Sequence, residues 1–203
     1  MTRLSQQDTR AHILDTGERL IHGSGFTALG LSELLREAAV PKGSFYHYFR
    51  SKEDFGEALI RRYFERYGQA VATLLAPQAG GTGRSRLMSY FARWSENACE
   101  EDGRSPCLAV KLAGEVADLS EPMRLALAEG MDRVIARLAE GLRAAQAEGS
   151  LAPVADADRL AEALYTNWLG MALRVKVTRN PALMAGLLED TASRLPPGTL
   201  PAG

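Results

Sequence analysis

The sequence predicts an all-α protein with a small N-terminal helical domain followed by a larger helical body. Apolar residues recur at spacings of three and four over stretches of helical length, and glycine, proline, serine or aspartate separates those stretches. Of the 203 residues, 46% are hydrophobic, which is enough to form a buried core. We expect residues 1–50 to form a three-helix domain and residues 51–203 to form a helical bundle.

Capping residues mark the expected helix ends. Asp8 or Thr9 can begin the first helix, and the glycines within residues 23–25 can close it. Residues 77–83 form the clearest loop of the chain. The helices of the body are expected over residues 51–76, 84–101, 120–148, 156–178 and 181–195. The expected core face of the helix over 120–148 holds Leu125, Leu127, Met131, Val134, Leu138 and Leu142.

Charge and composition limit the classes of protein to consider. The formal net charge is −1, and residues 1–66 hold ten Lys and Arg against nine Asp and Glu, so any positive surface must be local. The sequence has no run of about 18 apolar residues and no cationic-then-apolar leader, so we expect a cytoplasmic protein without a membrane span. Both cysteines are then expected to be reduced. The body has no histidine, which argues against a metal site, and no cofactor motif is present.

A sharp corner separates two short helices in the N-terminal domain. Apolar residues at spacings of three and four predict a helix over residues 31–38. The dipeptide Val40-Pro41 ends it, because the residue before a proline is disfavoured in the α region and proline suits the first turn of a new helix. The second helix is expected over residues 42–49, with Phe45 and Phe49 facing inward.

The outer face of this second helix carries small, hydroxyl, aromatic and cationic groups, which suit phosphate oxygens and base edges. Gly43 lacks a Cβ, so its backbone can approach a phosphate closely. Ser51, followed three residues later by an acid, is typical of a helix cap, and Lys52 adds a cation beside the free N–H groups of that helix start. The predicted DNA contacts on these two helices are Lys42, Gly43, Ser44, Tyr46, His47, Tyr48 and Lys52.

The string PKGSFYHYFRSKEDFGEALI resembles the helix-turn-helix of TetR-family transcriptional repressors. Their pattern small-Gly-x-x-Tyr-x-x-Phe-x-x-Lys is met by Gly43, Tyr46, Phe49 and Lys52. The resemblance implies an N-terminal DNA-binding domain, a C-terminal domain with an effector pocket and a dimer face, and no enzymatic activity. Double-stranded operator DNA and a second copy of the chain are the implied partners. Family members commonly place a phosphate contact at the position of Thr27, which the residues alone would equally make a helix cap.

Ser105-Pro106 is a second informative place, because a serine cap followed by proline is typical of a helix start. Cys107 would then lie in the first helical turn, where unpaired N–H groups and nearby cations such as Lys111 lower a thiol pKa from about 8.5. Acidic residues 100–102 oppose that effect. A small buried hydrophobe is the alternative role for Cys107. Cys99 is expected to be structural, and a disulfide between the two cysteines would need Cα atoms within about 7 Å.

The string SPCLAVKLAGEVADLSEPMR, together with DTR, LSELL and PKGSFYHYFRSK, resembles the NemR subgroup of that family, which senses reactive electrophiles and oxidants through a cysteine before leucine. The resemblance covers most of the chain and implies that Cys107 is the sensor. Pro106 stands where glycine is usual. Lys176 could lower the Cys107 thiol pKa and trap a sulfenic acid as a sulfur–nitrogen bond, or it could be a surface lysine that covers apolar neighbours.

Two other hypotheses stay open. A non-covalent apolar effector could bind among aromatic and thioether side chains that would equally suit a plain core, namely Phe91, Trp94, Met131, Tyr165 and Trp168. A thiol enzyme using Cys107 is the other hypothesis, although the body lacks a histidine to act as its base. The expected helices over 156–178 and 181–195 mix large and small residues and resemble the hairpin that pairs across the dimer axis in the TetR family.

Overall fold

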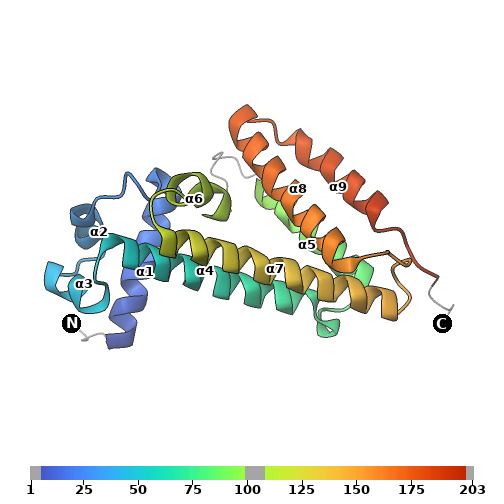
Figure 1. The fold of residues 1–203 in the computed structure, drawn as a ribbon, viewed down its shortest axis with the longest axis horizontal. Helices are drawn as coiled ribbons and strands as arrows, with labels where there is room; N and C mark the ends of the chain where they lie inside the picture. Colours follow the sequence, from blue (N-terminus) through green and yellow to red (C-terminus); the bar gives the residue numbers. More distant parts are fainter. Residues whose placement is uncertain (1–5, 99–107, 200–203) are drawn as a thin grey trace. The chain divides into compact units, whose positions relative to one another are not determined.

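The computed structural model describes residues 6–98 and 108–199, and within these ranges it confirms the all-α fold. Figure 1 shows how the helices follow one another along the chain. The described helices are α1 (Gln6–Ser24), α2 (Leu31–Glu37), α3 (Lys42–Tyr48), α4 (Lys52–Leu75), a 3-10 turn (Pro77–Ala79), α5 (Gly83–Ala98), α6 (Leu108–Val116), α7 (Glu121–Ala147), α8 (Ala157–Thr178) and α9 (Ala182–Arg194).

The chain divides into two compact units. One contains residues 1–64 and 108–130, and the other contains residues 65–107 and 131–203. The first unit therefore holds α1 to α3, the N-terminal part of α4, α6 and the start of α7. In this unit α1, α2 and α3 gather around the beginning of α4 (Figure 1). We call α1, α2 and α3 together the head.

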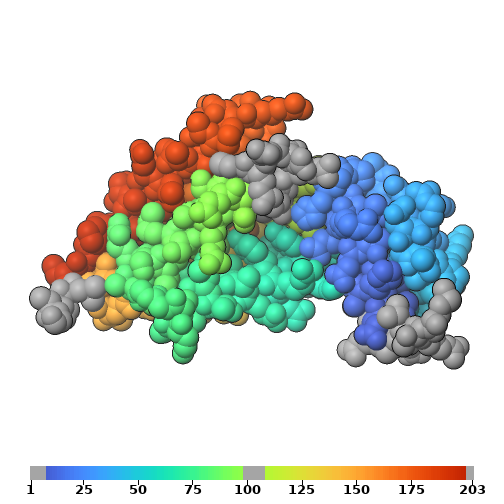
Figure 2. Space-filling view, turned by 180° about the vertical axis from the view of Figure 1, so that it is seen from behind, coloured from blue at the N-terminus to red at the C-terminus, as the bar shows by residue number. Residues whose placement is uncertain are grey.

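The second unit is a helical body. Within it α5 and α8 both pack against α9, and the space-filling view shows α5 in green beside α9 in red (Figure 2). Asp156 begins α8 by accepting a hydrogen bond from the N–H of Arg159 at 3.0 Å, as expected for an N-terminal cap. Arg179, in a left-handed conformation, closes the same helix.

One residue expected on the core face of α7 is exposed in the structure, so that prediction was wrong. Leu125 is 41% exposed, whereas Met123, Ala126 and Leu127 are buried. Successive residues of an α-helix are separated by about 100°, so Leu125 lies on roughly the opposite side of the helix from Met123. Apolar character alone did not show which side of the helix faces inward.

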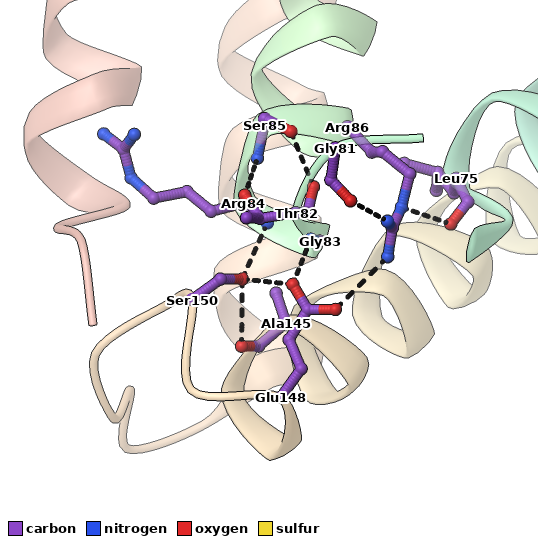
Figure 3. A network of polar contacts seen from close by, with 10 residues as sticks. All are labelled: Leu75, Gly81, Thr82, Gly83, Arg84, Ser85, Arg86, Ala145, Glu148 and Ser150. Carbon is purple, nitrogen blue, oxygen red and sulfur yellow. Dashed lines mark hydrogen bonds and ion pairs between the residues drawn. The ribbon is translucent and has the colours of Figure 1, made fainter. Parts of the chain in front are cut away.

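A polar network closes the end of the body where α5 begins (Figure 3). The guanidinium of Arg86, whose residue is only 6% exposed, donates to the carbonyls of Leu75 (3.1 Å) and Gly81 (2.8 Å) and lies 3.5 Å from the Glu148 carboxylate. That carboxylate also accepts hydrogen bonds from the Ser150 hydroxyl and from the N–H of Gly83. The network satisfies orphan groups at the start of α5 and ties them to the end of α7.

The hydrogen bond from Ser150, the N–H of Gly83 and the charge of Arg86 lower the pKa of Glu148 from its ordinary value. A carboxyl with a lowered folded-state pKa contributes stability above its unfolded pKa and loses it as the pH falls through the folded value.

We expect Glu148→Gln to lower the free energy of unfolding at neutral pH by about 1 kcal/mol, because a charged acceptor of several hydrogen bonds is lost. The difference between wild type and variant should shrink as the pH approaches about 3. Urea unfolding at neutral pH and at about pH 3 measures this difference in the free energy of unfolding. A difference that stays constant with pH would contradict the assigned role of the Glu148 carboxylate.

Candidate nucleic-acid interface and sensor region

The corner between α2 and α3 is held by backbone groups and by one side chain of α1. Ala38 caps the end of α2, and Ala39 adopts a left-handed conformation with a φ of 52°. The N–H of Val40 donates to the Leu35 carbonyl at 3.1 Å, and His12 Nε2 donates to the Ala38 carbonyl at 3.0 Å. Because a carbonyl oxygen only accepts, Nε2 of His12 carries the proton. Sequence reasoning missed His12, whose partner lies 26 residues away along the chain.

Helix α3 has one buried face and one exposed face. Phe45 and Phe49 are buried with Phe55 of α4, and the three ring centroids lie 5.2 to 5.8 Å apart. Such aromatic packing fixes the rotation of α3 about its own axis. Of the predicted contacts on α3, the exposed residues are Lys42, Gly43, Tyr46 and His47, and the half-buried ones are Ser44 and Tyr48.

The exposed start of α3 has features that suit a close ligand. The Lys42 amine lies 5.8 Å from the ring centroid of Tyr46, which is 48% exposed. A Cβ added at Gly43 would meet no atom within 4 Å. Among residues 6–98 and 108–199, no packing contact therefore requires glycine at this position, which agrees with the close approach of a ligand there.

Thr27 and Lys52 come together at the loop between α1 and α2. The Lys52 amine donates to the Thr27 carbonyl at 3.3 Å and lies 4.8 Å from the ring centroid of Phe26. The N–H of Thr27 donates to the Glu115 carboxylate of α6 at 3.1 Å. Partial burial lowers the pKa of Lys52. The phosphate-binding roles of Thr27 and Lys52 stay predictions.

The structure confirms the cap expected at the start of α4. Ser51 Oγ accepts a hydrogen bond from the N–H of Asp54 at 3.1 Å. The Asp54 carboxylate in turn accepts from the N–H of Arg50 at 2.8 Å, one residue earlier than in the usual reciprocal cap. That backbone hydrogen bond lowers the pKa of Asp54. The cap joins the end of α3 to the start of α4 and helps to fix their angle.

The aromatic residues considered as an effector site form one cluster in the body. Phe91 and Trp168 stack with centroids 5.2 Å apart, and Trp94 lies 5.7 Å from Trp168 and 5.6 Å from Tyr165. Trp168 Nε1 donates to the Thr191 hydroxyl at 2.9 Å. All four aromatic residues are buried, and the remaining candidate, Met131, is half-buried. Their contacts with one another are those of a core, and their role in binding an effector stays a prediction.

The sensor hypothesis concerns residues that the structure describes only in part. Cys99 and Cys107 lie outside the described residues. Lys176 is exposed in the last turn of α8. The Lys111 amine, expected from the sequence to favour a thiolate at Cys107, donates to the carbonyls of two residues at the end of α1. The roles of Cys107 and Lys176 stay predictions.

Two absences hold for the part of the chain that the structure describes. No helix there is long and apolar enough to cross a membrane. Among those same residues, no group of three or more His, Cys, Asp or Glu side chains could hold a metal ion.

A small helical head with an exposed face on α3, followed by a helical body, is the architecture of one known family of proteins. Residues 13–59 match bacterial regulatory proteins of the tetR family, and residues 83–189 match the tetracyclin repressor-like C-terminal domain. The chain belongs to the TetR family and is a transcriptional repressor of that family.

Individual members of the TetR family show which of its regulators this chain is similar to. The HTH-type transcriptional repressor NemR of Escherichia coli strain K12 is 44% identical over 181 residues, which cover 89% of this chain and 90% of NemR. The crystal structure of E. coli NemR in its reduced form has a TM-score of 0.88 and covers 97% of this chain and 100% of that one. The transcriptional regulator AcuR of Cereibacter sphaeroides is 39% identical over 163 residues, covering 77% of this chain and 71% of AcuR.

Proposed function

We propose that the protein is a homodimeric repressor that binds a near-palindromic operator and leaves it when Cys107 is modified by an electrophile or oxidant. The observation that carries operator binding is the exposed face of α3, fixed in rotation by buried Phe45 and Phe49. In a dimer, two copies of α3 would enter successive major grooves about 34 Å apart. Phosphate contacts from Lys42, Tyr48, Lys52 and the helix starts would set the register. The activity is binding rather than catalysis, and it takes place in the cytoplasm, where the operator is.

The outer face of α8 supports pairing with a second copy of the chain. Leu173 and Val177 are 52% and 76% exposed and lie four residues apart, on one side of the helix. Gly170 lies on the same side, and a Cβ there would meet no atom within 4 Å. A glycine inside an exposed helix costs about 1 kcal/mol relative to alanine, so close packing of another helix is a reason to have it. A second copy of α8 and α9 fits this apolar face.

The double variant Leu173→Asp/Val177→Asp is expected to be a monomer that has lost operator binding in a gel shift. Carboxylates that face one another across the dimer axis would repel one another, and burying them would cost the free energy of their hydration. Light scattering gives the mass, and circular dichroism checks the fold. Leu125→Asp is the control for an added surface charge, since it places one carboxylate on an exposed leucine of α7. Operator binding by a monomeric double variant would contradict the dimer model, and monomeric Leu125→Asp protein would mean that α8 is not the interface.

The proposed release by thiol chemistry rests on two supports. Cys107 directly precedes Leu108, where α6 begins, and a helix start favours a thiolate. The similar NemR structure is described as a reduced form, which suits a regulator whose state depends on oxidation. We include Lys176 as the amine that could trap an oxidised sulfur. Retention of release in a Cys107→Ser protein would instead favour a non-covalent effector bound at the aromatic cluster.

A further inference from the structure

The corner between α2 and α3 ends α2 in a Schellman motif that has an alanine at its left-handed position. Ala39 has a φ of 52°, and its N–H donates to the Arg36 carbonyl at 3.1 Å. The N–H of Val40 donates to the Leu35 carbonyl at 3.1 Å, which completes the motif. Glycine is the usual residue at such a position, because a Cβ crowds the following carbonyl oxygen in the left-handed conformation. The backbone of this corner is therefore strained at Ala39.

A strained residue persists only where its surroundings hold it in place. The Schellman hydrogen bonds use the carbonyls of Leu35 and Arg36, whereas the Ala38 carbonyl accepts from Nε2 of His12 at 3.0 Å. This carbonyl belongs to the planar peptide group that joins Ala38 to Ala39, so turning the group changes the φ of Ala39. Ala38 is only 2% exposed, and a buried carbonyl that loses its donor costs free energy. The hydrogen bond from His12 therefore favours the left-handed turn.

Helix α1 gives the His12 side chain a fixed base. Ile13, the next residue along the chain, is fully buried in the core. The guanidinium of Arg62 in α4 donates to the Ala11 carbonyl at 2.9 Å and to the Asp15 carboxylate at 2.7 Å. Packing and α4 thus set the position of His12 on both sides of its place in α1. All of these residues, and the corner itself, belong to one compact unit.

We propose that His12 is a positioning residue for operator binding, whose ring N–H holds the strained turn at Ala39 and thereby fixes the direction of α3. The inference rests on the proposed function, since α3 is the helix that would enter the major groove. Two residues, Val40 and Pro41, separate the turn from the start of α3 at Lys42. A rotation of the backbone at Ala39 therefore changes the direction in which the chain enters α3, and with it the placement of the predicted DNA contacts.

The first test measures operator affinity in His12→Ala and His12→Gln proteins. We expect a loss of about fivefold in His12→Ala, because the competent fraction falls in each head and both heads of the dimer must be in place. Alanine is a better helix former than histidine, so a weakened α1 would not explain the loss. Glutamine keeps a side-chain N–H donor, and His12→Gln should bind within about twofold of wild type. His22→Ala is the matched control in the last turn of the same helix and should bind as wild type does.

The second test relieves the strain itself. Glycine adopts the left-handed conformation without the penalty of a Cβ, and Ala39 is exposed, so Ala39→Gly removes little packing. We expect His12→Ala to cost less than about twofold in operator affinity when it is added to an Ala39→Gly protein, because the turn no longer depends on His12. An equal loss with and without Ala39→Gly would overturn the proposal, since a merely structural histidine would weaken the head in both cases. A loss in His12→Gln as large as that in His12→Ala would also overturn it.

Hydrogen exchange at the N–H groups of Ala39 and Val40 gives a readout that does not depend on the operator. Faster exchange in His12→Ala, restored in the double variant with Ala39→Gly, supports the assigned role, and unchanged exchange in His12→Ala contradicts it. Circular dichroism checks that every variant is folded at the temperature of the measurement. Failure of the wild type to bind the operator would count against the proposed function alone, because the exchange rates would still show whether His12 holds the corner.

Discussion

Gly43→Glu is expected to leave the protein folded and to abolish operator binding, with a loss of affinity on the order of 100-fold or more. A Cβ added at Gly43 would meet no atom within 4 Å, so the fold leaves room for a side chain to begin there. A carboxylate in the first turn of α3 is favoured by the helix dipole. Against DNA the same carboxylate faces phosphates, and opposed like charges cost several kcal/mol, while about 1.4 kcal/mol is already a tenfold change in affinity.

The matched control for this substitution is Gly68→Glu on α4. Gly68 is also a helical glycine whose added Cβ would meet nothing within 4 Å, but it lies outside the head. Both variants carry the same change in net charge, so a general effect of charge on DNA binding would appear in both. Full operator binding by Gly68→Glu and none by Gly43→Glu identifies α3 as the reading element. Equal affinities in the two variants would contradict that assignment.

Local sequence patterns were sufficient to predict the architecture of the head. The helix expected over residues 42–49 is α3, and the inward positions of Phe45 and Phe49 are confirmed by their burial. The Ser51 cap is confirmed by its hydrogen bond to the N–H of Asp54. These features depend on residues within about four positions of one another, where spacing and capping preferences act directly.

Contacts between distant parts of the chain could not be predicted in the same way. The sequence placed Lys111 beside Cys107, but its amine bonds to carbonyls 88 and 89 residues earlier in the chain. The hydrogen bonds of His12 and Glu115 and the burial of Arg86 likewise depend on how helices pack, which no local spacing encodes. Leu125 shows the same limit, since a leucine on an amphipathic helix does not by itself indicate which side is buried.

Cys107→Ser is expected to keep operator binding and to lose release by N-ethylmaleimide. The reagent reacts with a thiolate, and a serine hydroxyl of nearly the same size is not a comparable nucleophile near neutral pH. Release of about 100-fold requires a difference of roughly 3 kcal/mol between modified and unmodified states in their affinity for DNA. Removing the thiol removes that difference, while the predicted DNA contacts, which lie on α3, at Thr27 and at Lys52, are unchanged.

The Cys99→Ser variant tests the role of Cys99 separately from that of Cys107. Cys99 is expected near the end of a helix, where the dipole disfavours a thiolate, so this variant should still be released by the reagent. Equal loss of release in both serine variants would mean that the cysteines act together, as they would in a disulfide.

The most direct measurement is a gel shift on an operator fragment with wild type, Cys99→Ser and Cys107→Ser side by side, each with and without N-ethylmaleimide and hypochlorite. The proposed mechanism predicts that all three bind the operator, that reagent releases wild type and Cys99→Ser, and that Cys107→Ser stays bound. Release of Cys107→Ser to the same extent as wild type would contradict a switch at this cysteine.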